Sequence, residues 1–207
     1  MPRPRSDIRP RIIEAARERF LVDGVDGASL RRIARRAHTS IGMIYYYFPS
    51  KDDLFLGVVE DVYAGLLADL SVALGAAEPI DDRVRRLCAR LGRMSDVELT
   101  VIRLVVREAL GTSTRRARLL ERFATGHLPL IVGTVLEGQR QGVFTDRFPL
   151  PLLVVVLGTI AFVPQVARRL VDPTSPIPLA SLPSGEAIAP DLAAIVLRAI
   201  GRNDEPA

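Results

Sequence analysis

The residues best suited to chemistry gather at positions 29–51, which hold four arginines within six positions, three consecutive tyrosines and the only lysine of the chain. They are Arg31, Arg32, Arg35, Arg36, Tyr45, Tyr46, Tyr47 and Lys51. Such side chains bind an anionic partner through charge and hydrogen bonds, and a dense basic cluster is the electrostatic signature of nucleic-acid binding. A run of charge is often only a solvated face, which is the alternative. Because four arginines on so short a stretch exceed what solubility requires, we favour the binding interpretation.

Two short helices must position these side chains. Ser is a favoured N-cap, so one helix is predicted to follow Ser29 and a second to follow Ser40. The second helix stops before Pro49, because the residue preceding a proline disfavours the helical conformation. Only residues 37–39 lie between the two helices, and they can form little more than a turn. Two helices joined in this way form a helix-turn-helix, here over residues 29–48, which places its second helix in the major groove of DNA.

The apolar residues of this segment have the spacing of an inward face. They are Ile33, Ala34, Ala37, Ile44 and Phe48. Large apolar side chains at helical spacing pack a helix pair against its neighbours, and the alanines let two backbones approach closely. The basic and aromatic residues are therefore predicted to face outward.

The rest of the chain reads as further helices. Leu, Val, Ile and Ala recur at helical spacing, and aromatic residues make up only 5% of the chain. The predicted helices span residues 9–22, 51–74, 80–94, 96–110, 114–140, 150–170 and 190–201. The proline-rich residues 171–189 are predicted to form a loop, and Pro164 should kink or end the helix that contains it. We expect an all-α protein with an N-terminal three-helix domain at residues 1–50 and a larger helical domain at 51–207.

Charge is unevenly distributed along the chain. Residues 1–50 hold ten arginines against five acidic residues, a net +5. The formal charge of the whole chain is +4, so the remaining residues together contribute −1. A basic head on a nearly neutral body fits a small nucleic-acid-binding domain attached to a domain with another task.

The sequence does not indicate a disulfide, a secretion signal or a membrane-spanning helix. The single cysteine, Cys88, excludes an internal disulfide and fits a reducing cytoplasm. The apolar run at residues 150–163 is shorter than the about 18 residues of a membrane span and is predicted to be a buried helix. The basic N-terminus lacks the apolar stretch of a signal peptide and reads as a disordered arm. We expect a cytoplasmic protein without a membrane partner.

Catalysis and metal binding are not indicated either. His38 and His127 are the only near-neutral bases, and neither stands beside a nucleophile motif. The sequence contains no glycine-rich phosphate loop and no cluster of metal-ligand residues. We therefore expect a protein that is not an enzyme, with no catalytic residue, no metal site and no cofactor.

The segment ASLRRIARRAHTSIGMIYYYFPSKDDLF resembles the N-terminal domain of the tetracycline-repressor (TetR) family of bacterial regulators. That family shows a Ser or Thr at a helix start, an Ile-Ala pair, a turn, then Ser-x-Gly-x-Leu-Tyr-x-Tyr-Phe and x-x-Lys-x-x-Leu. The matching residues are Ser29, Ile33, Ala34, residues 40–48, Lys51 and Leu54. The resemblance covers about residues 9–57 and is specific.

The resemblance implies an all-helical homodimer whose two heads bind double-stranded DNA. It implies that Arg31 reads a base edge, as arginine does on guanine, and that residues 41–43 and Tyr46 face the bases. Tyr45, Tyr47 and Lys51 would hold phosphates, which fixes register without reading sequence. The predicted DNA-binding residues are Ser29, Arg31, Ser40, Ile41, Gly42, Met43, Tyr45, Tyr46, Tyr47 and Lys51. The alternatives are packing for the tyrosines and a solvated helix start for Lys51.

Three positions depart from the family pattern. His38 stands in place of the usual turn glycine, which is tolerable because histidine is enriched in left-handed backbone conformations. Ile41 and Met43 stand in place of commoner polar residues, and they can pack on thymine methyls but cannot hydrogen-bond bases. Specificity would then rest on Arg31 and on hydrophobic contact.

The apolar helices of the body are expected to form the dimer. An exposed 150–170 helix would favour aggregation, so its burial against a second copy is expected. The helix near 114–140, or the one near 190–201, would complete an intersubunit four-helix bundle.

The rest of the body is expected to enclose a cavity for a small hydrophobic effector. The candidate ligand contacts are Arg103, Arg107, Glu108, Phe123 and His127, although such residues are more often surface or satisfied core groups. The predicted function is a ligand-responsive transcriptional repressor that leaves a pseudo-palindromic operator when the effector binds. The alternative is a DNA-bound organiser or partner-binding protein with the same head and no inducer.

Overall fold

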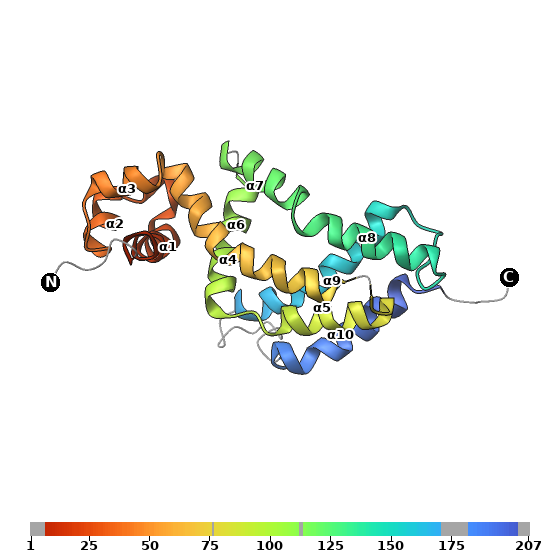
Figure 1. The fold of residues 1–207 in the computed structure, drawn as a ribbon. Helices are drawn as coiled ribbons and strands as arrows, with labels where there is room; N and C mark the ends of the chain where they lie inside the picture. The colour runs from red at the N-terminus through yellow and green to blue at the C-terminus, as the bar shows by residue number, and fades with distance from the viewer. Residues whose placement is uncertain (1–6, 76, 112–113, 171–181, 203–207) are drawn as a thin grey trace. The chain divides into compact units, whose positions relative to one another are not determined.

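The structure is a computed structural model that describes residues 7–75, 77–111, 114–170 and 182–202. Within these residues the chain is all-α, as predicted, with only an isolated bridge pair between Phe144 and Gly201 (Figure 1). The helices are α1 (Ile8–Gly27), α2 (Leu30–Arg36), α3 (Ile41–Tyr47), α4 (Lys51–Ala73), α5 (Ile80–Gly92), α6 (Asp96–Ala109), α7 (Thr114–Ala124), α8 (His127–Arg140), α9 (Leu150–Leu170) and α10 (Gly185–Ile200). The predicted N-terminal arm and most of the proline-rich loop lie outside the described residues.

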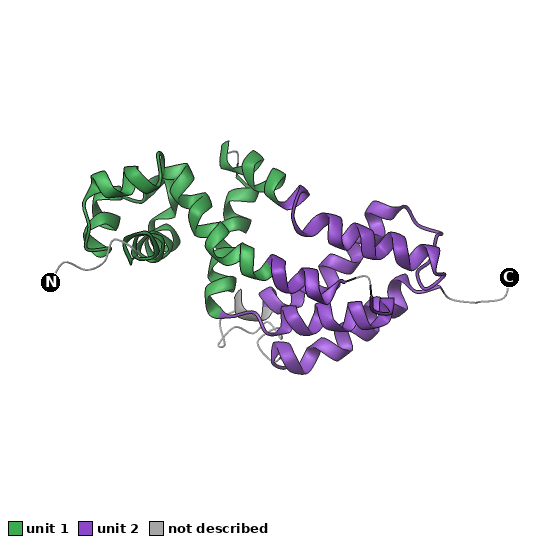
Figure 2. Ribbon diagram, in the orientation of Figure 1, with its two compact units in different colours: residues 1–66, 96–122 green, residues 67–95, 123–207 purple. Residues whose placement is uncertain are grey.

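The helices pack as two compact units, shown separately in Figure 2. Unit 1 contains residues 1–66 and 96–122, and unit 2 contains residues 67–95 and 123–207. Unit 1 therefore combines the three N-terminal helices with most of α4, with α6 and with nearly all of α7. This grouping differs from the predicted boundary at residue 50. That boundary separates a DNA-binding domain from a ligand-binding domain by function, and it stays a prediction.

Unit 1 is built around the aromatic side chains of α1 and α4. Phe20 and Phe55 are fully buried and meet edge to face, with ring centroids 6.1 Å apart. Phe48, just after α3, lies against α4 at Gly57, where an added Cβ would be 2.5 Å from the Phe48 ring. The glycine thus lets the end of α3 pack directly on α4.

Unit 2 holds α5, α8, α9 and α10, and α10 packs against α5 and α9. The backbones of α5 and α10 approach very closely, because a Cβ added to Gly92 would lie 2.4 Å from the carbonyl oxygen of Gly185. A second close approach joins Gly138 of α8 to the ring of Phe144. Gly92 and Gly185 therefore allow the close packing of α5 on α10, and Gly138 leaves room for the Phe144 ring.

The predicted helix 114–140 is wrong in one respect, because the structure breaks it into α7 and α8 at Gly126. Gly126 has φ −104° and ψ −106°, which is not helical. Pro129, in the first turn of α8, explains the break. In a continuous helix its ring would clash with the carbonyl group of Thr125, whereas proline is tolerated in the first turn of a new helix.

One predicted helix end agrees with the structure and another has moved. The regular part of α1 ends at Gly24, close to the predicted end at residue 22, because Gly24 has φ 75° and ψ 166°, and one further helical turn follows to Gly27. The last helix begins at Gly185 rather than residue 190, because the Ser184 hydroxyl accepts a 3.2 Å hydrogen bond from the Ala187 amide and caps it. Pro164 lies within α9 but does not end it.

Helix α9 is long and apolar enough to cross a membrane, by length and composition only, over Leu150–Ala167. A core helix of a soluble protein passes the same test, and Leu153, Leu157 and Ala161 on its inner face are fully buried within unit 2. Only 28% of the window is buried within the single chain, so the burial predicted for this helix is incomplete there.

Candidate nucleic-acid interface

The helix-turn-helix forms where the sequence predicts it. Ser29 and Ser40 occupy the N-cap positions of α2 and α3, and the Ser40 hydroxyl accepts a 3.3 Å hydrogen bond from the Met43 amide. Ser29 makes no such side-chain bond. His38 has φ 51°, the left-handed conformation in which the family usually places glycine. The turn therefore keeps its shape with a residue that tolerates this region of backbone space.

The predicted inward residues are all buried. Ile33, Ala34, Ala37, Ile44 and Phe48 expose 5% of their surface or less. They fasten α2 and α3 to the core of unit 1, so the opposite faces of both helices are left for solvent or a partner.

The outward face of α3 carries the predicted base-reading and phosphate-binding residues. Tyr46 is 76% exposed and Tyr45 50% exposed, so neither fills the packing role that was the alternative. Ile41 and Gly42 are also exposed, whereas Met43 and Tyr47 are half-buried. The Tyr47 ring meets Tyr46 edge to face at 5.1 Å. Exposed aromatic and apolar side chains on one face of a short helix are suited to contact with a partner.

The arginines of α2 divide into one paired and three unpaired side chains. Arg36 makes two 3.0 Å hydrogen bonds to Glu18 of α1 and so helps hold the two helices together. Arg31, Arg32 and Arg35 are exposed, and none has a partner among the described residues. Three free guanidinium groups beside α3 make this surface strongly basic.

Lys51, the predicted phosphate contact, begins α4 and is half-buried. Its ammonium group donates a 2.7 Å hydrogen bond to the main-chain oxygen of Asp26, at the end of α1. An ammonium group has three donors, so two remain for a phosphate. Ser50 caps the same helix start, since its hydroxyl accepts from the Asp53 amide at 3.1 Å.

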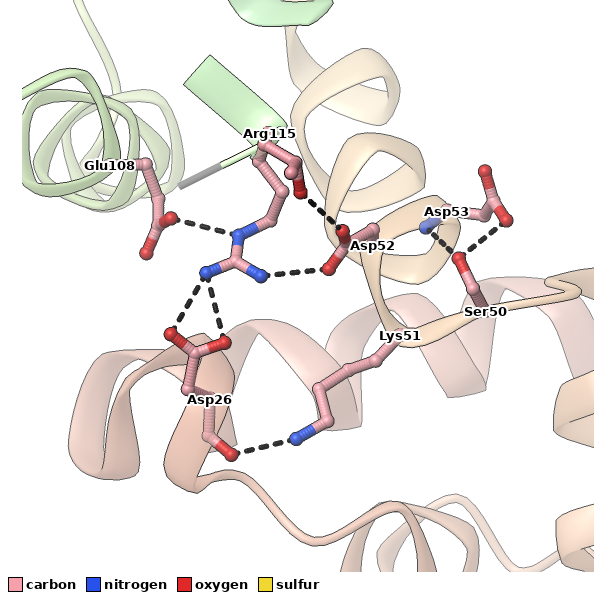
Figure 3. Close-up of polar contacts among 8 residues, drawn as sticks. Asp26, Ser50, Lys51, Asp52, Asp53, Glu108 and Arg115 are labelled. Atoms are coloured by element: carbon pink, nitrogen blue, oxygen red, sulfur yellow. Dashed lines mark hydrogen bonds and ion pairs between the residues drawn. The ribbon is translucent and has the colours of Figure 1, made fainter. Parts of the chain in front are cut away.

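Beside Lys51 lies a cluster centred on Arg115 of α7 (Figure 3). The Arg115 side chain is 6% exposed and bonds three carboxylates from three other helical segments. The distances are 3.0 Å to both oxygens of Asp26, 2.7 Å to Asp52 and 2.8 Å to Glu108. Burial opposes the charge, but the hydrogen bonds to Asp52 and Glu108 and the charge of Asp26 outweigh it and raise the pKa of Arg115. The guanidinium therefore stays charged.

Two further ion pairs join α7 to α4. Arg118 bonds Asp53 at 3.0 Å, and Arg122 bonds both oxygens of Glu60 at 2.8 Å. The bond from Arg122 lowers the pKa of Glu60. Arg122 also lies over the ring of Tyr63, 4.6 Å from its centre. Sequence reasoning missed this set, because the partners are about sixty residues apart and only the acidic first turn of α4 hinted at it.

The predicted ligand contacts are distributed over both units. In unit 1, Arg103 is exposed, Arg107 donates a 2.5 Å hydrogen bond to the Phe20 carbonyl oxygen, and Glu108 bonds Arg115. In unit 2, the rings of Phe123 and His127 contact one another at 5.2 Å. Their assignment to a ligand stays a prediction.

Unit 2 contains an open groove of about 450 Å³ between α5 and α10. None of the predicted ligand residues lines it. The lining residues are Arg85, Ala89, Glu186, Ala189, Pro190, Ala194, Leu197 and Arg198.

Comparison with known proteins finds relatives among bacterial transcriptional regulators. The family described as "Bacterial regulatory proteins, tetR family" matches residues 12–58. The chain is 32% identical over 168 residues to the HTH-type transcriptional repressor SCO4008 of Streptomyces coelicolor, covering 79% of this chain and 83% of that protein. It is 30% identical over 142 residues to the HTH-type transcriptional repressor NicS of Pseudomonas putida, covering 67% and 66% respectively.

Solved structures share the fold at lower identity. The transcriptional regulator FadR of Bacillus subtilis, solved in complex with stearoyl-CoA, has a TM-score of 0.71 at 14% identity and covers 92% of this chain and 98% of its own. The ketosteroid transcriptional regulator KstR2 of Mycobacterium tuberculosis has a TM-score of 0.67 at 18% identity, with 98% of each chain covered.

Proposed function

The chain belongs to the tetR family of bacterial regulatory proteins, and on that premise we propose that it is a cytoplasmic repressor that binds a pseudo-palindromic DNA operator as a homodimer. The observation that carries the proposal is the outward face of α2 and α3. Free arginines lie there beside exposed tyrosines on a helix whose inner side is fully packed. Its named relatives are regulators and not enzymes.

We assign the DNA contacts by the kind of information that each residue can carry. Arg31, at the start of α2 and without a partner in the described chain, reads a base edge. Ile41, Gly42, Met43 and Tyr46 face the bases. Tyr45, Tyr47 and Lys51 bind phosphates and set the register of the protein on the duplex.

Two variants separate these roles. Arg31→Ala should relax specificity at one base position, at a cost of about 1–3 kcal/mol for the preferred base. Lys51→Ala should weaken binding to all sequences alike and reduce the salt slope by about one unit for each protomer, or about two for the homodimer. Titration of matched and single-mismatch duplexes at several salt concentrations measures both, and equal sequence-independent losses would show that Arg31 is misassigned.

We assign dimerisation to α9 and α8. The outer face of α9 exposes Leu152, Val155 and Val163, and α8 exposes Leu128. These side chains recur at helical spacing along α9, which suits an intersubunit bundle of four helices. The helix α10 is the alternative partner, although Leu192, Val196 and Ile200 on one of its faces are already buried.

We further propose that a small hydrophobic effector binds the body and releases the operator by preferring a second conformation. FadR of Bacillus subtilis was solved with stearoyl-CoA and KstR2 is named a ketosteroid regulator, so likeness to them supports an apolar effector. A panel of acyl-CoA and steroid compounds should contain one that raises the melting temperature and weakens operator binding. If every compound that binds left operator affinity unchanged, the alternative of a DNA-bound organiser without inducer would be preferred.

A further inference from the structure

Arg115 joins α7 to three other helical segments of unit 1, namely the end of α1, the start of α4 and the end of α6 (Figure 3). It lies on α7, far in the sequence from the helix-turn-helix, and bonds Asp26 before α2 and Asp52 beside Lys51. Its third carboxylate partner, Glu108, anchors the guanidinium to α6. We propose that Arg115 is a positioning residue for DNA binding that acts through Lys51, an inference that rests on the proposed phosphate contact of Lys51.

The backbone around Asp26 shows why such an anchor is needed. The Lys51 ammonium group is held by the main-chain oxygen of Asp26, so its position depends on where that oxygen lies. Asp26 stands between Gly24, which has a φ of 75°, and Gly27. Because Gly24 breaks the regular helix, the Asp26 oxygen lies in a single turn that is closed by one hydrogen bond, from the Ala28 amide to the Gly24 carbonyl at 3.1 Å, so a contact from another helix adds a restraint.

Arg115 restrains both segments that meet at the Lys51 contact, the one that carries Asp26 and the one that carries Lys51 itself. Two of its hydrogen bonds hold the Asp26 carboxylate, and a third holds Asp52, the residue next to Lys51. The planar guanidinium presents its donors in a fixed fork, so it sets the distance between the two segments. The side chain of Asp26 is 85% exposed, which makes its fixed geometry dependent on this contact.

Electrostatics alone predicts the opposite effect for one variant. An exposed carboxylate near a phosphate-binding lysine repels DNA, so its removal should tighten binding if charge were the only factor. If Asp26 instead transmits the position set by Arg115, then Asp26→Ala should weaken binding although it removes a negative charge. The sign of this change separates positioning from charge.

The experiment measures DNA affinity by fluorescence anisotropy for the full chain across a range of salt concentrations. Lys51→Ala should weaken binding about thirtyfold at 0.15 M salt, because the homodimer loses two phosphate contacts and each contributes about 0.9 to the salt slope. Arg115→Gln and Asp26→Ala should each give part or all of this loss and of the reduction in slope. In the Lys51→Ala background, neither substitution should add a further loss.

The matched control is Arg116→Gln, which removes the same charge from the adjacent position of α7. Arg116 is exposed and has no partner among the described residues. Its loss should change affinity by less than about twofold, since an exposed charge is screened by salt. Circular dichroism checks that each variant is folded, and Asp26→Ala serves as the test if Arg115→Gln does not fold.

The outcomes distinguish this inference from the proposed function. If Lys51→Ala changed neither affinity nor slope, the phosphate contact itself would be wrong and the role of Arg115 would fall with it. If Lys51→Ala weakened binding but Asp26→Ala tightened it, or if the losses of the double variants simply multiplied, the positioning role alone would be overturned.

Discussion

At the scale of the residue, His38 combines an unfavourable conformation with a position in the middle of the DNA-binding motif. Its φ of 51° lies in the left-handed region, and the side chain is exposed, so no packing compensates for the strain. The conformation is imposed by the turn, whose amides at His38 and Thr39 bond the carbonyls of Arg35 and Ala34. The turn therefore has a preference for residues that tolerate a positive φ.

We predict that His38→Val lowers the free energy of unfolding by about 1–2 kcal/mol, because a β-branched residue is poorly accommodated in this region. His38→Gly should change it little, since the relief of strain is offset by the greater freedom of glycine in the unfolded chain. Urea denaturation of both variants measures the difference. Equal stability of the valine and glycine variants would mean that the turn changes its backbone conformation.

At the scale of the element, helix α3 depends on its packing against α4. The ring of Phe48 lies against Gly57, and an added Cβ would stand 2.5 Å from a ring carbon. We predict that Gly57→Ala destabilises the protein by about 1–3 kcal/mol through overpacking, despite alanine's better helix propensity. Gly65→Ala, on the same helix where an added Cβ meets no atom within 4 Å, is the matched control and should stabilise slightly. Thermal unfolding of the two variants should therefore shift in opposite directions.

The ion pair between Glu60 and Arg122 makes the contact of α4 with α7 dependent on pH. The pKa of Glu60 is lowered in the folded state, so its contribution is present above the ordinary value of 4.5 and is lost as pH falls through the folded value. We predict that stability decreases below about pH 4.5 in the wild type and that Glu60→Gln flattens this decrease. Melting temperatures of both proteins, measured from about pH 3 to about pH 7, test this prediction. A wild-type and variant profile of the same shape would exclude a role for this pair.

At the scale of the whole molecule, the exposed apolar face of α9 is what the proposed dimer must cover. Val155 on this face is 60% exposed. We predict that Val155→Glu raises the dimer dissociation constant by at least about tenfold, because the interface would bury an unpaired carboxylate. Val72→Glu, at a 75% exposed position of α4, is the control and should leave the dimer intact. Sedimentation velocity measures both, and a dimer unaffected by Val155→Glu would place the interface elsewhere.

Local patterns predicted most of the DNA-binding motif but little of its support. The caps, the turn and the inward face of α2 and α3 follow from residues within about twenty positions, so they could be predicted. The break before α8 follows from Pro129. It was not predicted, because apolar residues keep a helical spacing through residues 114–140. The cluster around Arg115 joins residues up to 89 positions apart, and such contacts leave no periodic signal in one sequence.

The central claim, that the dimer reads a specific DNA sequence through α2 and α3, is tested most directly by selecting bound duplexes from a random pool at near-physiological salt. The account predicts an enriched palindrome for the wild type and a loss of definition at one position of each half-site for Arg31→Ala. Salt-sensitive binding to any DNA, without enrichment of a sequence, would contradict it.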